Sequence, residues 1–587
     1  MTPLSTGSTA AHSEGHSGGH TIVIGGGIAG LASAALLARD GQRVTLLEAG
    51  DTLGGRAGTW TDQGFRFETG PSWYLMPGVF DHFFRLFGSS SAEQFELRRL
   101  DPGYRVYFED TADPIDVRAE RADNIALFES IEPGAGAALD RYLDSAEDTY
   151  RMAVSRFLYT SFQSFRPLLV RDVLTRIGRL ARLLLQPLDK FVAGFVTDPR
   201  LRQVLGYPAV FLGSSPDQTP SMYHLMSHLD LADGVLYPLG GFTRLIDSIA
   251  DLARAEGVEV ITGARVTSIT TTPGTRPGAS KRLRASVAGV SYVDRAGTTV
   301  RLAADRVVSA ADLHHTETEL LPEPLQSYPE SWWQHRVSGP GAVLVLLGVT
   351  GELPKLQHHT LLFTSDWGEN FGRIFGKTPS VASPASFYVC MPSATDPGVA
   401  PDGSSNLFLL VPIPADPGLG HGGIDGAGSP AIEAIADDAI GQLADWAGIP
   451  DLADRIVVRR TIGPGDFADD LNSWRGGALG PAHTLKQSAF FRGSNVSSKV
   501  DGLYYAGGTT IPGIGLPMCL ISAEILLKRM RSDTSTGPLA EPLPRRGSVP
   551  VPVRVTVPLH PESDGIAGSA GPAGSSGASG FGAPSAS

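Results

Sequence analysis

The chain has 587 residues, of which 42% are hydrophobic and 8% aromatic, so it is long enough for two or three substructures with ordinary globular cores. Its formal net charge of −13 argues against nucleic acid as a general partner. The two cysteines, Cys390 and Cys519, are isolated and offer neither a disulfide framework nor a metal-ligand spacing. The sequence therefore predicts an intracellular protein with no metal site and no nucleic-acid partner.

The first 19 residues lack the basic and apolar regions of a signal peptide and are rich in Gly and Ser. We predict a disordered tail there, although His12, His16 and His20 recur every fourth residue and leave metal binding as an alternative. No uncharged apolar run in the chain is long enough to span a bilayer, so we expect any membrane association to be peripheral.

A glycine turn follows the first apolar strand, TIVIG, and precedes the helical stretch ASAALLARDG. Gly25 permits the tight turn, Gly27 lets the backbone approach a pyrophosphate, and Gly30 lets helix and strand pack closely. The next strand, RVTLLE, ends in Glu48, which is the acidic position expected to hold ribose hydroxyls. These elements together predict a dinucleotide site with its phosphates at the helix N-terminus.

The segment after Glu48, AGDTLGGRAGTW, favours FAD over a nicotinamide cofactor. It places Gly54, Gly55 and Arg56 just beyond the ribose strand, where a guanidinium can pair with phosphate or cover the flavin edge. We assign Gly55 and Arg56 to the cofactor site.

The segment from Arg151 to Lys190 has eight basic residues and only two acidic ones, interspersed with Phe and Leu. Such a basic, amphipathic stretch can lie on an anionic membrane surface. The alternative is a helical cap on the core whose arginines face water.

Helices and strands alternate between residues 236 and 414, which indicates an α/β class. An amphipathic helix around Leu245–Ala253 is followed by a strand that contains Val266, a further candidate for the cofactor site. Buried strands are predicted at 306–312, 342–349 and 406–414.

A second glycine turn stands near the end of the chain, in DGLYYAGGTTIPGIGLPMCLISAEI. Gly507 and Gly508 allow the backbone to approach the ribityl chain and pyrophosphate. A helix begins near Leu516 or Pro517, and its positive end would face the flavin carbonyl where negative charge gathers on reduction. We assign Pro517 and Met518 to the cofactor site. We predict that both glycine turns close on one FAD.

The motifs resemble a known family. The E-x(5)-GGR arrangement is similar to the flavoprotein superfamily of monoamine oxidases, protoporphyrinogen oxidases and carotenoid desaturases. Between His20 and about Met530 the chain looks like bacterial CrtI-type phytoene desaturases, especially those of actinobacteria. This resemblance rests on three phrases: Phe65 to Gly88, Gly206 to Ile246, and His483 to Pro517.

The resemblance implies non-covalent FAD and stepwise dehydrogenation of phytoene to lycopene, through phytofluene, ζ-carotene and neurosporene. It also implies peripheral attachment to the inner face of the cell membrane and electron transfer to quinone or oxygen. The sequence departs from the common Ala-Gly-Thr-His-Pro-Gly phrase at residues 508–513 and has Met518 after the last proline, which alters the wall near the flavin.

The implied fold is a Rossmann-like FAD-binding domain of the amine-oxidase type, with an inserted mixed-sheet substrate domain and a helical membrane-facing region. The cofactor domain is predicted to comprise residues 20–100, 236–320 and 481–530. The substrate domain is predicted to comprise 101–235 and 321–480, with its membrane-associated helices at 151–197. Residues 531–587, rich in Gly, Pro and Ser, are predicted to be disordered like residues 1–19.

Phytoene offers no polar group, so recognition should depend on a long apolar channel. Candidate lining residues are aromatic: Phe65, Trp73, Tyr74, Phe80, Tyr207 and Phe211. We expect loss of an allylic hydride to the flavin and of a proton from the neighbouring carbon.

Glu68 is the candidate catalytic carboxylate near the flavin, with a loop anchor as its alternative role. Gln487, Arg492 and Asn495 are assigned to structure or to the channel mouth. The pairs His314–His315 and His358–His359 are expected to be exposed in polar loops.

Three alternatives remain on the same scaffold. These alternatives are a desaturase of another carotenoid intermediate, a flavin amine oxidase, and a non-catalytic carrier of isoprenoid lipids. The preserved second glycine turn weighs against the carrier, and no aromatic cage for an amine is evident.

Overall fold

The computed structural model describes residues 19–162, 175–274 and 283–546. A five-stranded parallel sheet gathers strands from both ends and the middle of the chain, in the order β20-β13-β1-β2-β9. Its strands are β1 (His20–Ile24), β2 (Arg43–Leu47), β9 (Glu259–Ile261), β13 (Arg306–Ser309) and β20 (Leu503–Tyr505). The two glycine turns therefore leave the same sheet, separated only by β13.

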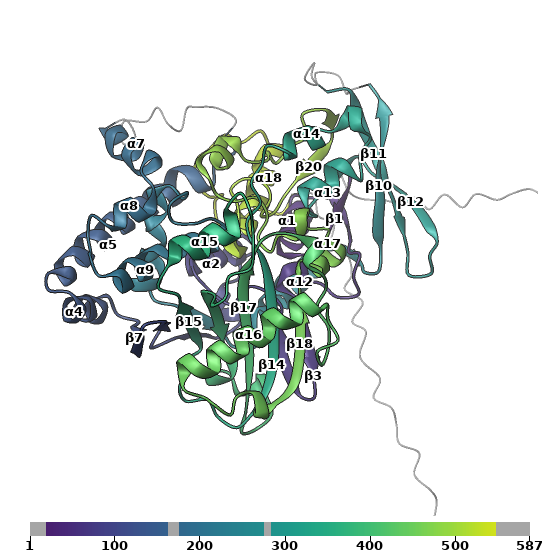
Figure 1. The fold of residues 1–587 in the computed structure, drawn as a ribbon. Helices are drawn as coiled ribbons and strands as arrows, with labels where there is room; N and C mark the ends of the chain where they lie inside the picture. The colour runs from purple at the N-terminus through teal and green to yellow at the C-terminus, as the bar shows by residue number, and fades with distance from the viewer. Residues whose placement is uncertain (1–18, 163–174, 275–282, 547–587) are drawn as a thin grey trace, which may run out of the picture. The chain divides into compact units, whose positions relative to one another are not determined.

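Three long helices pack beside this sheet: α1 (Ile28–Arg39), α12 (Gly241–Ala255) and α18 (Leu516–Met530). Figure 1 shows α1, in purple, next to α18, in yellow, although the two come from opposite ends of the chain. Every residue of α1 from Ile28 to Leu37 is buried, which explains its Ala-rich sequence, since small side chains let several neighbours approach. On α12 the predicted face of Leu245, Ile246 and Ile249 is buried as expected.

A mixed seven-stranded sheet forms the second substructure, in the order β18-β14-β17-β16-β15-β6-β7. Only β6 and β15 pair in parallel. The strands are β6 (Tyr104–Phe108), β7 (Thr111–Val117), β14 (Gly341–Thr350), β15 (His359–Phe363), β16 (Phe387–Cys390), β17 (Ser404–Ile413) and β18 (Ile456–Ile462). The α/β class with a mixed sheet is thus confirmed.

Both faces of this sheet are covered, which explains the continuous apolar run in β14. Leu344 and Leu346 point to a core shared with α5 (Ala135–Met152) and α9 (Pro199–Gly206). Val343 and Val345 point to a core shared with α16 (Pro430–Ala447), which lies across β14, β17 and β18 in Figure 1. A strand buried on both faces loses the alternation of polar and apolar residues.

Smaller elements complete the described fold. A third sheet joins β10 (Arg265–Pro273), β11 (Ala285–Val293), β12 (Thr299–Ala303) and β19 (Val500–Asp501). Two further antiparallel pairs are the hairpin of β3 (Thr59–Asp62) with β4 (Phe65–Glu68), and β5 (Leu97–Arg99) with the distant β8 (Leu236–Pro238). The remaining α-helices are α2 (Pro77–Leu86), α3 (Ser91–Gln94), α4 (Arg121–Ile131), α7 (Ile177–Leu185), α8 (Leu188–Val192), α10 (Pro208–Phe211), α11 (Met226–Leu231), α13 (Leu313–Thr318), α14 (Glu330–Trp333), α15 (Trp367–Phe375) and α17 (Pro464–Leu471).

The predicted membrane-associated stretch, 151–197, is mainly helical where it is described, with turns at 159–162, 186–187 and 193–197. α5 runs into a π-helical turn at Ala153–Leu158, and α7 and α8 follow, while residues 163–174 lie outside the described part. No helix among the described residues is both long and apolar enough to cross a bilayer.

The segment after α18 corrects the prediction of a disordered tail from residue 531. Residues 531–546 are described, and they return along α1 and α2: the Leu543 amide donates to the Leu86 carbonyl at 2.8 Å, and Arg39 Nε donates to the Leu543 carbonyl at 2.8 Å. Leu543 is buried, so this part contains one apolar anchor that the composition concealed. Residues 1–18 and 547–587, which cover nearly all of the first predicted tail and most of the second, lie outside the described residues.

Candidate functional site: a cavity between two glycine turns

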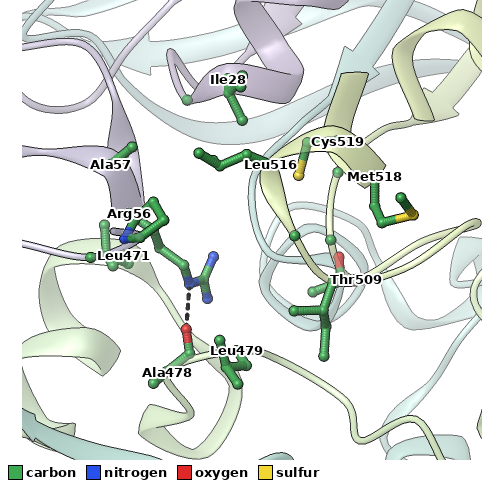
Figure 2. Close-up of a pocket in the computed structure, with 18 of the residues that line it drawn as sticks. Ile28, Arg56, Ala57, Leu471, Ala478, Leu479, Thr509, Leu516, Met518 and Cys519 are labelled. Carbon is green, nitrogen blue, oxygen red and sulfur yellow. Dashed lines mark hydrogen bonds between the residues drawn. The ribbon is translucent and has the colours of Figure 1, made fainter. Parts of the chain in front are cut away.

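A cavity of about 800 Å³ reaches both glycine turns. Its wall includes the turn between β1 and α1, the segment from Gly54 to Arg56, and the turn that leads into α18. Figure 2 shows Arg56 and Ala57 on one side of this space, with Thr509, Met518 and Cys519 across from them.

Ten of the eleven predicted cofactor residues line this cavity: Gly25, Gly27, Glu48, Gly55, Arg56, Val266, Gly507, Gly508, Pro517 and Met518. The exception, Gly30, acts as predicted between helix and strand. A Cβ added there would lie 1.9 Å from the Gly25 carbonyl oxygen, so only glycine lets α1 approach the turn this closely.

Glu48 lies at the end of β2, as the ribose position requires, and it also shapes the first turn. Its Oε2 accepts the Gly26 amide at 2.6 Å, and its Oε1 accepts the Gly50 amide at 2.7 Å. The carboxylate is thereby fixed at the rim of the cavity.

The glycines that face the cavity fit a bound dinucleotide. A Cβ at Gly27 or Gly508 would lie 3.8 Å from the nearest protein atom, and one at Gly55 would lie 3.4 Å away. Protein packing alone leaves room for a side chain at Gly27 and Gly508. A side chain at either position would instead take up space at the cavity wall, where a ligand needs to approach the backbone.

The N-termini of α1 and α18, which both border the cavity, lack side-chain caps. α1 begins after Gly27 and α18 after Gly515, and neither glycine has a side chain that could accept the first free amides of its helix. The uncapped N–H groups and the positive ends of the two dipoles suit phosphate at one turn and the electron-rich edge of a flavin at the other.

The second turn is braced by a buried arginine. Arg492 is 5% exposed, and it donates to the backbone carbonyls of Thr510, Pro481 and Gly508. Burial lowers the pKa of Arg492 to about 10, so the guanidinium stays protonated at neutral pH. Asn495, fully buried, donates to the Ile511 carbonyl at 3.0 Å.

Gln487 also has a structural position: its side chain exchanges hydrogen bonds with the Val337 backbone and donates to the Ala482 carbonyl. The roles suggested for Gln487, Arg492 and Asn495 therefore resolve in favour of structure.

His483 and Tyr223 are cavity residues that the sequence analysis did not single out. His483 Nδ1 lies 2.9 Å from the Tyr223 hydroxyl, and His483 Nε2 accepts the Ile514 amide at 3.2 Å. Burial lowers the pKa of His483 well below its ordinary value, so the ring is neutral. A Cβ at Gly513 would lie 2.3 Å from this ring, which ties the glycine after Pro512 to the histidine. The only sequence signal was the position of His483 in the family-like phrase before the second turn.

Glu68, the candidate catalytic carboxylate, does not line the cavity. Its Oε1 accepts the Thr243 amide at 3.2 Å at the start of α12, and burial raises the pKa of Glu68 to about 7. Thr69 and Gly70, which follow Glu68 at the end of β4, line the cavity, whereas Glu68 itself does not. This hydrogen bond fits the alternative role suggested for Glu68, a loop anchor, and its catalytic role stays a prediction.

The rest of the cavity wall is mainly apolar and aromatic. Of the candidate aromatics, Trp73 and Tyr207 line the cavity, whereas Phe65, Tyr74 and Phe80 lie in the packed core. The Phe211 side chain is outside the described part. Further lining residues come from the helical region and from around α15: Tyr150, Leu158, Met226, Leu229, Phe363, Trp367, Phe371 and Phe387.

Both histidine pairs differ from the expected exposed loops. His358 and His359 are 4% and 0% exposed, at the start of β15, and burial lowers the pKa of His358 to about 3 and that of His359 well below its ordinary value. His315 on α13 lines the cavity, and His314 lies 2.8 Å from Glu330. The polar residues around these pairs led to the prediction of loops, whereas the structure has a buried strand at one pair and a short helix at the other.

Comparison with known proteins agrees with this geometry. The profile of the family described as flavin containing amine oxidoreductase matches residues 28–525. The chain belongs to this family. Within it the chain is 41% identical over 517 residues to a carotenoid 3,4-desaturase of Haloarcula japonica, covering 88% of this chain and 99% of that protein.

Further relatives are carotenoid enzymes as well. A ζ-carotene-forming phytoene desaturase of Myxococcus xanthus is 32% identical, covering 87% of this chain and 94% of its own length. A phytoene desaturase of Fusarium fujikuroi is 30% identical, covering 87% and 89%. The resemblance to the carotenoid desaturases is therefore confirmed, and the cofactor is FAD.

Solved structures show the same fold at low identity. An oxidoreductase of Methanosarcina mazei matches with a TM-score of 0.54 at 16% identity, covering 87% of this chain and 100% of that one. Wild-type putrescine oxidase bound to putrescine matches with a TM-score of 0.53 at 14% identity, covering 88% and 99%.

Proposed function

We propose that the chain is an FAD-dependent carotenoid desaturase that dehydrogenates phytoene stepwise to lycopene, through phytofluene, ζ-carotene and neurosporene. The observation that carries the proposal is the cavity, which joins the glycine turns of a dinucleotide site to a wall of aromatic and aliphatic side chains. The relatives in Myxococcus xanthus and Fusarium fujikuroi, both phytoene desaturases, support this choice of substrate.

FAD, when bound, supplies the acceptor for the hydride that leaves an allylic carbon. The residues of the chain bind the cofactor, orient the substrate and exclude water from the cavity. Gly27, Gly507 and Gly508 let the cofactor reach the backbone, and α18 directs its N-terminal dipole into the cavity. Trp73 and Tyr207 offer flat apolar surfaces to a polyene, which has no group for a hydrogen bond.

A second candidate is desaturation of an already conjugated carotenoid at its 3,4 position. The observation in its favour is the 41% identity to the Haloarcula japonica 3,4-desaturase, compared with 32% and 30% to the two phytoene desaturases. Both candidates use the same cofactor chemistry, and they differ in the intermediate that the cavity accepts.

We also propose that the protein binds peripherally to the inner face of the cell membrane, where a hydrocarbon substrate dissolves, and passes electrons to quinone or oxygen. On α7 the side chains of Ile177 and Leu185 are 59% and 73% exposed. Arg182 lies on the same short helix, and a basic helix with exposed apolar residues suits an anionic lipid surface. Flotation with anionic vesicles tests this surface: the I177S/L185S double variant should float less than wild type, and equal flotation would refute the assignment.

Expression in two cell lines tests the function. One line accumulates phytoene and the other accumulates lycopene, and the extracted pigments are separated by chromatography. New conjugated pigment from phytoene supports the phytoene-to-lycopene proposal, whereas change only in the lycopene line supports the 3,4-desaturase. Unchanged pigment in both lines, together with flavin bands in the purified protein and oxidation of added amines, would indicate an amine oxidase. Carotenoid bound without any flavin bands would indicate a carrier.

A further inference from the structure

A cluster of buried ligand-type side chains lies behind the cavity wall, where β15 pairs with β16. The pairing sets His359 opposite Cys390, and His358 precedes His359 in the chain. One ligand atom from each of these three side chains lies within 4.8 Å of the others. His358, His359 and Cys390 are 4%, 0% and 2% exposed.

In each imidazole one nitrogen makes a hydrogen bond that orients the ring, and the other nitrogen makes none with any described residue. His358 Nδ1 lies 2.8 Å from the Thr395 hydroxyl, and His359 Nδ1 lies 2.7 Å from the Tyr388 hydroxyl. The two Nε2 atoms are buried and have no hydrogen-bond partner among the described residues. Two unpaired buried nitrogens beside a thiol are unfavourable unless something binds them. Hydrogen bonds that fix the outer nitrogen are also the usual arrangement around a metal-bound histidine.

We propose that His358, His359 and Cys390 form a binding site for monovalent copper. Imidazole nitrogens and a thiolate are soft ligands that favour copper or zinc over calcium or magnesium. Among the described residues no fourth His, Cys, Asp or Glu joins the group, and a structural zinc ion requires four ligands. One thiolate also balances the charge of Cu⁺, whereas Zn²⁺ would retain a net positive charge in a buried site.

Binding is a simple exchange with no change of oxidation state. Cu⁺ forms bonds to one nitrogen of each imidazole and to Sγ of Cys390, and the thiol proton leaves to solvent. This site was not predictable from the sequence, because its ligands do not have the spacing of a metal-binding motif. Strand pairing alone brings position 390 beside positions 358 and 359.

The site is coupled to the cavity through two of its wall residues. Trp73 stacks on His359 with ring centroids 4.4 Å apart and planes 10° apart, and Tyr388 shares its hydroxyl with His359 and Ser72. Both Trp73 and Tyr388 line the cavity. An ion on His359 would therefore fix the part of the wall against which the polyene is proposed to lie.

Titration of the purified flavoprotein with Cu⁺ under anaerobic conditions, against a coloured copper chelator, tests the site. We expect one tightly bound Cu⁺ per chain that Cys390→Ser weakens by more than the roughly 10- to 100-fold that loss of an outer hydrogen bond costs. Cys519→Ser, which changes the only other cysteine, is the matched control and should keep the site. Equal copper affinity in wild type and the Cys390→Ser variant would overturn the proposal.

X-ray absorption of copper-loaded wild-type protein gives an answer that does not depend on whether a variant folds. The proposal requires one sulfur and two imidazole nitrogens around the metal. A spectrum with nitrogen ligands alone would place the copper elsewhere, for instance on the N-terminal histidines, and would refute the site. Preferential binding of Zn²⁺ in competition would refute the choice of Cu⁺. Neither outcome depends on the carotenoid substrate.

Discussion

The turn between β1 and α1 is held by close glycine packing and one carboxylate, whereas the turn before α18 is held by a buried arginine and a buried histidine. In the first turn Gly30 packs on Gly25, and Glu48 at the end of the next strand accepts the Gly26 amide. In the second, Arg492 binds three carbonyls and His483 accepts the Ile514 amide. The comparison teaches that one side of a cofactor site can be specified by glycine spacing, while the facing side depends on buried polar side chains.

The largest effect is expected from Gly30→Ala. The new Cβ would lie 1.9 Å from the Gly25 oxygen, so α1 must move off the sheet, at a cost of about 3 kcal/mol or more. We expect loss of folded flavoprotein, measured by thermal unfolding and FAD content. Gly441→Ala on α16 is the matched control, because a Cβ there meets nothing within 4 Å and should stabilise the helix slightly. A Gly30→Ala protein with full FAD content and an unchanged unfolding midpoint would contradict this account.

Gly508→Val should separate cofactor binding from folding. Its Cβ would lie 3.8 Å from the nearest protein atom, so the apoprotein should keep its unfolding midpoint while the side chain blocks the flavin. The FAD content, measured from absorbance at the flavin bands, should fall from one FAD per chain to nearly none. If the variant binds FAD as wild type does, the glycines of the second turn do not face the cofactor.

Arg492→Met should loosen only the second turn. Removing the guanidinium leaves the carbonyls of Thr510, Pro481 and Gly508 without their donor, which should cost about 3 kcal/mol of unfolding free energy and weaken FAD about tenfold. Isothermal titration of apoprotein with FAD measures the second effect. Arg141→Met, at an exposed position on α5, is the control. Equal FAD affinity in both variants would show that the brace is not needed.

Glu68→Gln should have the smallest effect, visible mainly as a change in pH dependence. Since burial raises the pKa of Glu68 from its ordinary 4.5 to about 7, the folded state favours the protonated carboxyl. That stabilisation is complete below pH 4.5 and is lost as the pH rises to about 7, so the variant should have a flatter stability profile across this window.

Chemical denaturation at several pH values measures the profile, with the exposed Glu352→Gln as control. Pigment formation by Glu68→Gln should stay within about twofold of wild type, because the carboxyl is outside the cavity. A loss of activity of roughly 100-fold or more would support Glu68 as a catalytic group.

The cofactor half of the fold was predictable because its signals are local. Gly25, Gly27 and Gly30 follow an apolar strand at fixed spacing, and Glu48 closes the next strand. Backbone geometry dictates these residue types wherever the turn occurs, so no tertiary information is needed. The buried strand at 342–349 was predictable for the same reason, since a continuous apolar run indicates a strand that is buried on both faces.

Prediction is hardest where burial is decided by distant partners. His358 and His359 stand among polar letters, yet strand pairing places them in the core. Glu68 precedes residues of the cavity wall, yet the N-terminus of α12 attracts its carboxylate. His483 and Tyr223 meet across 260 positions of sequence, a pairing that periodicity cannot reveal. Polar side chains are placed by their hydrogen-bond partners, and here those partners are remote.

The final turn of α18 ties this helix to two other segments of the chain through hydrogen bonds from Lys528 and Arg529. Lys528 is fully buried and donates to the carbonyls of Tyr159, Ser535 and Gly537, while Arg529 donates to that of Ser161. The C-terminal end of the 15-residue helix α18 is thus hydrogen-bonded to the chain beside the π-helical turn, and its N-terminal end lines the cavity. Displacing the backbone at 159–161 must strain or break those bonds, so this segment and α18 cannot move independently.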